Sequence, residues 1–177
     1  MKVLVTRPVN NAHVTIERLE NLGHSVLHEP LLSVERLKTD LPEGLFDGII
    51  LTSSNAVKSL DECWTLPRQD VPIFTTGTAT AEAARQHGFE RTHSINGSAL
   101  DLVRQLPDLA ECGWELLYPC AETVAHDVPG LLREQHVSCT AWPCYRTTPA
   151  TRFSETAETA LKDRGIDVVL LYSTRTA

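Results

Sequence analysis

The sequence predicts an α/β fold of two similar lobes, each a parallel sheet flanked by helices, joined by a two-stranded connector. Short apolar runs typical of strands alternate with amphipathic helical patterns along the whole chain. Several of these runs carry apolar residues at every position, which is typical of strands covered on both faces. The chain also contains a weak internal duplication, which indicates two copies of one α/β unit.

The first half of the chain begins with a short apolar strand at residues 2–6 and a helix at 11–23 that ends at Gly23. Residues 24–37 are expected to be extended, with Pro30 marking an edge or a turn. A loop or short helix at 41–47 leads into the remaining elements. These are strands at 48–52, 71–77 and 91–95, and helices at 55–64 and 78–88.

The second half continues the same alternation. We expect helices at 98–109 and 128–136, and a strand at 114–119. Residues 137–150 are extended, and Ser154 is placed to cap a helix over 154–165. A final strand is expected at 167–173. Such β-α alternation favours parallel sheets with right-handed crossovers.

The duplication is clearest in two stretches, "FDGIILTSSNAV" at 46–57 and "IDVVLLYSTRTA" at 166–177. In both, an aspartate and an apolar run precede a cluster of hydroxyl side chains. The extended stretches 31–38 and 141–148 are candidates for strands that cross between the two lobes. After its hydroxyl cluster the first copy continues into another strand and helix, whereas the second copy reaches Ala177. We therefore expect the chain to lack a C-terminal part.

Composition narrows the classes of function. The chain has 177 residues, of which 42% are hydrophobic, so a packed core is expected. The net charge of −7 argues against nucleic acid as a partner, although a local cleft could still bind an anion. No apolar run approaches the ~20 residues of a membrane span. The five cysteines have no metal-ligand spacing and indicate reduced thiols in a cytoplasmic protein without a metal site.

Five polar turns follow the predicted strands at the point where parallel sheets bind ligands. Each turn is rich in Ser, Thr or small residues, and each could present backbone N–H groups and hydroxyls to an anion. N-capping of the following helices explains any one of them equally well. Nucleotide-binding glycine patterns and nucleophile elbows are missing. His13 and His126, in the turns after the first strand of each copy, are more simply surface residues.

The ordered set of motifs resembles the uroporphyrinogen-III synthase family. The resemblance rests on "VLVTRP", "DGIILTSSNAV", "FTTGTATAEAARQHGF", "CYRTTP" and "DVVLLYSTRTA", which together extend over nearly all of the chain. It implies lobes formed by 1–35 with 149–177 and by 38–145. It also implies a monomer that needs no cofactor and converts the linear tetrapyrrole hydroxymethylbilane into uroporphyrinogen III, inverting the last ring with loss of water.

The resemblance further implies which residues form the site. Tyr145, in the family's Y-x-T motif, would be the acid for the leaving hydroxyl or would orient it. The polar positions expected to bind substrate are Arg7, Ser53, Ser54, Asn55, Gly77, Thr78, Thr80, Ser173 and Arg175. The stretch "PCAETVAHDVP" departs from the family pattern of a glycine and a basic residue, which predicts weaker carboxylate binding there.

Of two alternative functions, only the first fits the residues. A non-enzymatic bilobed binding module for a small anionic ligand would share the crossing strands and the polar turns. A receiver or flavodoxin-like interaction domain would need an acidic pocket or a flavin loop after the early strands, and "VTRP" supplies neither.

Overall fold

A computed structural model describes residues 1–65 and 68–172 of the chain, except for the side chains of Asn10 and Asn11. The chain divides into two compact units. The first contains residues 1–35 and the chain from Thr147 onward, and the second contains residues 36–146. Among the described residues, no helix is long and apolar enough to cross a membrane.

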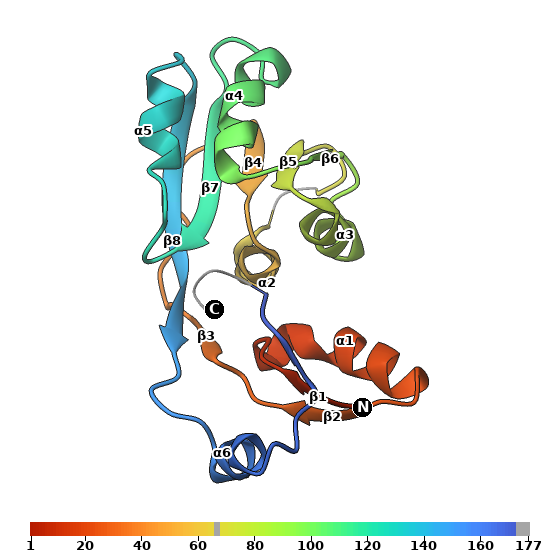
Figure 1. The fold of residues 1–177 in the computed structure, drawn as a ribbon. Helices are drawn as coiled ribbons and strands as arrows, with labels where there is room; N and C mark the ends of the chain where they lie inside the picture. Colours follow the sequence, from red (N-terminus) through yellow and green to blue (C-terminus); the bar gives the residue numbers. More distant parts are fainter. Residues whose placement is uncertain (66–67, 173–177) are drawn as a thin grey trace. The chain divides into compact units, whose positions relative to one another are not determined.

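The first unit is built on a parallel sheet of three strands in the order β2-β1-β9 (Figure 1). The strands are β1 (Lys2–Val5), β2 (Ser25–His28) and β9 (Val168–Leu170). Helix α1 (Val9–Asn21) connects β1 to β2, and helix α6 (Glu155–Lys162) precedes β9. The predicted strand at 24–37 is broken around Pro30, and β3 (Leu32–Arg36) follows the break.

Helix α6 begins where the sequence predicts. Ser154 is its N-cap, and the Ser154 Oγ accepts a hydrogen bond from the Ala157 N–H at 3.2 Å. The same residue donates twice to Glu29, from its backbone N at 2.7 Å and from its Oγ at 2.6 Å. Glu29 is buried, and these bonds satisfy its carboxylate. The start of α6 is thereby fixed to the segment that follows β2.

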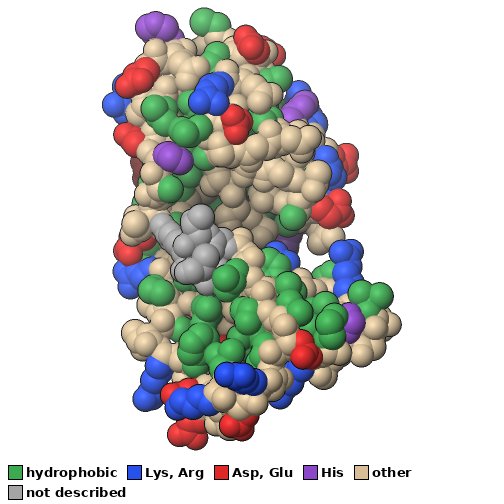
Figure 2. Space-filling view, in the orientation of Figure 1, with side chains coloured by type: hydrophobic (Ala, Val, Ile, Leu, Met, Phe, Trp, Pro, Cys, Tyr) green, Lys and Arg blue, Asp and Glu red, His purple; other side chains and the backbone are tan. Residues whose placement is uncertain are grey.

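Part of the surface of this unit is apolar. Figure 2 shows hydrophobic side chains gathered on the face of the unit that contains β1, β2 and α1. Large exposed apolar side chains occur on α1 and at β9, including Val14 on the helix and Val169 on the strand. The central strand β1 is nevertheless well covered, because Val3, Leu4 and Val5 are all buried.

The second unit contains most of the six-stranded sheet β3-β8-β7-β4-β5-β6 (Figure 1), of which β3 lies almost wholly in the first unit. Its further strands are β4 (Gly48–Leu51), β5 (Ile73–Thr76), β6 (Thr92–Ile95), β7 (Glu115–Ala121) and β8 (Ser138–Pro149). The pairs β4–β5, β5–β6, β4–β7 and β7–β8 are all parallel. Strand β8 continues past residue 146 and so belongs in part to each unit.

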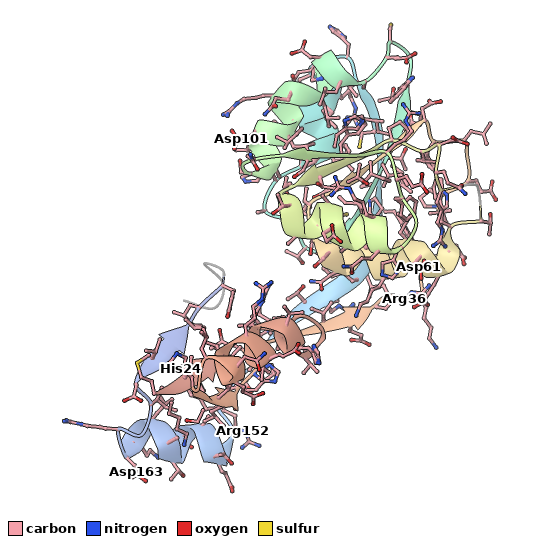
Figure 3. The ribbon with its side chains drawn as sticks, turned by 90° about the vertical axis from the view of Figure 1, so that its right-hand side faces the viewer. His24, Arg36, Asp61, Asp101, Arg152 and Asp163 are labelled. Carbon is pink, nitrogen blue, oxygen red and sulfur yellow. The ribbon has the colours of Figure 1, made fainter. Side chains whose placement is uncertain are left out.

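Four helices connect these strands. They are α2 (Ser54–Cys63), α3 (Thr78–Gln86), α4 (Ala99–Leu109) and α5 (Val128–Arg133). Helix α2 contacts α3, and α4 contacts α5. With right-handed crossovers, the first pair covers one face of the sheet and the second pair covers the other. Helix α4 starts with a capping box between Ser98 and Asp101. Asp101 is labelled in Figure 3.

The main core of this unit lies between the sheet and the helices α4 and α5. It combines Ile50, Phe74 and Leu116 from three strands with Leu102 and Leu106 from α4, all almost completely buried. The finding that β4 is buried at all four positions confirms the predicted covered parallel strand. The mixed α/β architecture with parallel sheets and flanking helices is therefore as the sequence predicts.

A β-bulge interrupts the pairing of β7 with β8. Cys120 pairs with Pro143, but the next residue, Ala121, pairs with Tyr145. Cys144 is the additional residue on β8 and is fully buried. Its backbone carbonyl accepts hydrogen bonds from the Leu37 N–H at 2.9 Å and from the Ser59 hydroxyl at 3.3 Å. The extra residue is therefore held by the residue that follows β3 and by α2.

Candidate active site

The topology of the second unit indicates where a ligand would bind. Strand β4 is followed by α2, and its neighbour β7 is followed by α5, so the chain leaves these two strands toward opposite faces of the sheet. In open α/β sheets, ligands bind beyond the carboxyl ends of the strands at such a switch point. The segment 52–55 follows β4 at this edge, and Glu122 follows β7.

The turn after β4 supplies hydroxyls and a helix N-terminus. Ser53 is the N-cap of α2, and its Oγ accepts a hydrogen bond from the Asn55 N–H at 3.2 Å. The capping interpretation of this residue is therefore correct. Ser54 and Asn55 form the first turn of the helix and are partly exposed. Backbone N–H groups at a helix start lack intrahelical partners and favour anions, so capping and anion binding are compatible here.

The turn after β5 is a second helix start at the same edge of the sheet. Gly77 has φ of +77°, a backbone conformation that strongly favours glycine, and its N–H donates to the Ile95 carbonyl at 3.0 Å. Thr78 begins α3 and is exposed. Thr80 lies further along the first turn and is only 7% exposed. The side chain of Thr80 is thus directed into the protein, unlike that of Thr78.

Hydrogen bonds from side-chain hydroxyls connect the residue that follows β4 to the neighbouring strands β7 and β5. The Oγ1 of Thr52, just after β4, lies 3.2 Å from the Oη of Tyr118 on β7. The Thr52 carbonyl accepts a hydrogen bond from the Thr76 Oγ1 at the end of β5, also at 3.2 Å. Tyr118 and Thr76 were not predicted from the sequence. A tyrosine within the buried run "ELLYP" was the available signal, because buried phenols normally find a partner.

Tyr118 is almost completely buried, and burial raises the pKa of its phenol to about 12. The hydrogen bond with Thr52 acts in the opposite direction and is smaller. Nearby Cys120 and Tyr145 contribute further small increases to this pKa. The phenol of Tyr118 therefore remains protonated near neutral pH, and Tyr145 lies in the same electrostatic neighbourhood.

Tyr145, the residue that the sequence suggests as an acid, lies on β8 after the bulge. Its side chain is 7% exposed, and its backbone carbonyl accepts a hydrogen bond from the Glu122 N–H at 2.8 Å. The backbone of Tyr145 is thereby tied to the turn that follows β7. This places the residue at the edge of the sheet where a ligand is expected, with a largely buried ring.

An arginine that sequence reasoning overlooked lies next to Tyr145. Arg146 donates two hydrogen bonds to the Glu122 carboxylate, from Nε at 2.6 Å and from an Nη at 2.8 Å. This two-bond contact lowers the pKa of Glu122. Both side chains are about half exposed. The edge of the sheet after β7 therefore does carry a basic group, contributed by the neighbouring strand, although its own turn contains none.

In the first unit, Arg7 follows β1 directly. Its guanidinium donates to the Thr15 hydroxyl at 3.1 Å and lies 4.6 Å from the centre of the Tyr172 ring. The Arg7 carbonyl accepts a hydrogen bond from His28 Nε2 at 2.8 Å in the tautomer that protonates this nitrogen. The arginine is thus fixed from three sides. Ser173 and Arg175 lie outside the described residues.

A pocket of about 250 Å³ lies near Arg7 in the same unit. The turn after β1 forms one side through Pro8 and Val9. Residues 30–34 and 148–150 form the rest. The Ser33 hydroxyl, which donates to the Thr148 carbonyl at 3.3 Å, connects these last two segments. The pocket walls are mainly apolar.

In the part of the chain that the structure describes, these strand ends carry neither a metal-ligand cluster nor an activated thiol. Among the described residues, no three or more His, Cys, Asp or Glu side chains are grouped to hold a metal ion. All five cysteines are free. Burial raises the pKa of Cys120 and Cys144 to about 11 and that of Cys139 to about 12, which disfavours the reactive thiolate.

Comparison with known proteins decides the family. The model of the uroporphyrinogen-III synthase HemD family matches residues 13–177. The chain belongs to the uroporphyrinogen-III synthase family. This confirms the resemblance seen in the sequence motifs.

Solved structures of uroporphyrinogen-III synthases have a similar fold. A mutant enzyme from the extremely thermophilic bacterium Thermus thermophilus superimposes with a TM-score of 0.60 at 18% identity, covering 96% of this chain and 71% of the other. The protein from Helicobacter pylori gives 0.58 at 19% identity, covering 90% and 67%. A comparison with curated protein sequences finds no significant match.

Proposed function

We propose that this protein is a cyclising lyase of haem biosynthesis that converts hydroxymethylbilane into uroporphyrinogen III. The family match over residues 13–177 carries this conclusion. In the reaction, the linear tetrapyrrole loses its terminal hydroxyl as water. The nitrogen lone pair of the pyrrole that carried the hydroxymethyl group assists this departure, which turns that ring into an electrophilic azafulvene. The last ring then attacks through its substituted α-carbon, giving a spiro intermediate. The original methylene bond to that carbon breaks and forms again at the other α-carbon of the same ring, which leaves the ring inverted.

We further propose that the two units are the lobes of the family fold, 1–35 with 149–177 and 38–145, and that strand-end turns bind the substrate. The substrate carries many carboxylates and is flexible. Backbone N–H groups and hydroxyls distributed over several turns suit such a molecule better than one deep charged pocket. Holding its two ends together removes much of the entropic cost of ring closure.

The proposed binding residues fall into two groups. In the second unit, Ser53, Ser54 and Asn55 start one helix, while Gly77 and Thr78 start the next, so both turns would grip carboxylates. Thr80 belongs to the family pattern, but its burial supports a role in shaping the turn after β5. In the first unit, Arg7 would pair with a carboxylate, and the nearby apolar pocket would accept a pyrrole face. Ser173 and Arg175 remain predicted contacts from the sequence.

Tyr145 is the proposed acid or orienting group for the departing hydroxyl. Its position supports this, because its backbone is bonded to the turn after β7 and its ring lies near Tyr118. Protonating the leaving hydroxyl assists departure of water. The phenol recovers a proton from solvent, or takes the one that the last ring loses from its formerly unsubstituted α-carbon when that pyrrole regains its aromaticity. Arg146 would attract a further carboxylate beside this group.

A coupled assay tests the proposal. Purified protein is supplied with hydroxymethylbilane generated in place, and the oxidised products are separated by chromatography. The type III isomer should replace the type I isomer in proportion to the amount of protein added. If only the type I isomer forms, and the protein binds a small anionic ligand without converting it, the result would instead favour a binding module for anionic ligands. The same samples, run on a sizing column, would test the expected monomer.

A further inference from the structure

The hydroxyl of Tyr118 is a polar group in an otherwise apolar setting. Tyr118 is 4% exposed and belongs to the core cluster formed with Ile50, Phe74 and the helices α4 and α5. A phenylalanine would fill the same space without bringing a polar atom into the core. The hydroxyl is directed to one partner that the structure identifies, the Thr52 Oγ1 at 3.2 Å. The tyrosine therefore connects β7 to the residue at which β4 ends.

Thr52 is held by two different atoms. Its side chain bonds to Tyr118 from β7, and its carbonyl accepts the hydrogen bond of Thr76 from β5. The next residue, Ser53, caps α2 and starts the turn that we propose to bind substrate carboxylates. Restricting Thr52 from both neighbouring strands restricts this turn as well, so its N–H groups are arranged before substrate arrives.

We propose that Tyr118 is a positioning residue for substrate binding, acting through Thr52 on the turn 52–55. The inference rests on the proposed function. In this proposal the phenol acts indirectly, through its hydrogen bond with Thr52. Because preorganisation mainly reduces the cost of binding, loss of the hydroxyl should raise KM more than it lowers kcat.

The effect of the Tyr118 hydroxyl on KM should not depend on pH, because its phenol and the two thiols that influence it keep their protons near neutral pH. The groups that influence it are Cys120, Tyr145 and Cys139. Burial keeps the two thiols neutral and keeps the Tyr118 phenol protonated near neutrality. The hydrogen bond to Thr52 is consequently the same at mildly acidic and mildly alkaline pH, and so should be the difference between the wild type and a variant without the hydroxyl.

The test compares Tyr118→Phe with a matched control, Thr140→Val. Thr140 on β8 also makes a part-buried side-chain bond, to Glu115 at 2.7 Å, but at the opposite end of the same sheet. In Tyr118→Phe, KM should rise by about 3- to 10-fold, as expected for one lost hydrogen bond, with kcat within about twofold. Thr140→Val should leave both constants nearly unchanged. Thr52→Val combined with Tyr118→Phe should be no worse than either single variant.

Hydrogen exchange provides a readout that does not need turnover. Amides in the peptide 52–56 should exchange several-fold faster in Tyr118→Phe than in the wild type, and no faster in Thr140→Val. Equal exchange in Tyr118→Phe and wild type, or equal kinetic changes in the two variants, would overturn the positioning role. A wild-type protein that makes only the type I isomer would refute the proposed function, while the exchange result would still decide whether Tyr118 orders the turn.

Discussion

Arg68 should be a stability determinant of the second unit, because one side chain connects three separate segments. Its guanidinium donates to the Asp61 side chain, to the Asp61 carbonyl at 2.8 Å and to the His87 carbonyl at 2.9 Å. It also lies 5.5 Å from the centre of the buried Phe89 ring. The C-terminal ends of α2 and α3 are thereby joined (Figure 3 labels Asp61). We expect Arg68→Ala to loosen this junction.

The expected change in the free energy of unfolding follows from the hydrogen bonds that Arg68→Ala removes. Two bonds from a charged donor to backbone carbonyls and one to a carboxylate would total several kcal/mol if buried. Arg68 and Asp61 are 28% and 34% exposed, so solvent replaces part of each bond. We therefore expect a loss of about 1–2 kcal/mol at neutral pH. Arg104→Ala is the matched control, because Arg104 pairs with Asp101 at a more exposed position and should cause a clearly smaller loss of stability.

The pH dependence gives a second check. The hydrogen bond from Arg68 is the largest cause that lowers the pKa of Asp61 below its ordinary value of 3.8. A carboxyl with a lowered folded-state pKa stabilises the protein above its unfolded pKa and loses that contribution as the pH falls through the folded value. The difference between wild type and Arg68→Ala should therefore be complete at about pH 6 and shrink toward about pH 3.

Urea unfolding followed by tryptophan fluorescence measures this difference. All three tryptophans lie in the second unit, and buried Trp64 caps α2 close to Asp61. The midpoint should fall for Arg68→Ala with the slope unchanged. A difference below ~0.3 kcal/mol at neutral pH, or one that is equal at the two ends of this pH range, would show that the junction does not stabilise the fold in this way.

Three further outcomes are expected. Ser154→Ala removes the cap of α6 and leaves the buried Glu29 with one donor fewer, so far-UV circular dichroism should show a loss of about 2 kcal/mol, and an unchanged transition would contradict this. Tyr145→Phe should reduce formation of the type III isomer at least about tenfold if its phenol is the acid, whereas a loss under about twofold would remove that role. A thiol reagent at mildly alkaline pH should modify exposed Cys112 first and reach the thiols whose pKa is raised by burial much later, which mass spectrometry of the modified peptides would establish. The thiols expected to react last are Cys120, Cys139 and Cys144.

The sequence predicted helices and strands well where a single short-range interaction determines the structure. The apolar run of β4, the glycine after α1 and the cap at Ser154 each follow from short-range chemistry. The break in the extended stretch 24–37 lies around Pro30, the residue that the sequence marked as an edge or a turn. By contrast, the pairing of β7 between β8 and β4 depends on contacts between distant segments, which no single stretch reveals.

The candidate site shows the same division. Ser53 and Gly77 could be predicted as helix-start residues because the turn chemistry is local. Tyr118 and Arg146 could not, because each acts on a residue at least 24 positions away, Thr52 and Glu122 respectively. Thr80 is a polar residue of the kind expected to contact a ligand, but its position around the helix α3 directs its side chain inward. Side-chain direction of this kind is set by packing.

The extra residue Cys144 decides which way the end of β8 presents its side chains. If the same residues formed an uninterrupted ladder, Ala121 would stand opposite Cys144, and every later residue of β8 would change face. A change that abolished the bulge but kept Cys144 in the strand would therefore exchange the orientations of Tyr145 and Arg146 and separate the guanidinium from Glu122, whereas deletion of Cys144 would leave Tyr145 opposite Ala121. Homologous chains that differ in length by one residue here should be compared by the partner of Ala121, since alignment of the letters alone would match side chains that point in opposite directions.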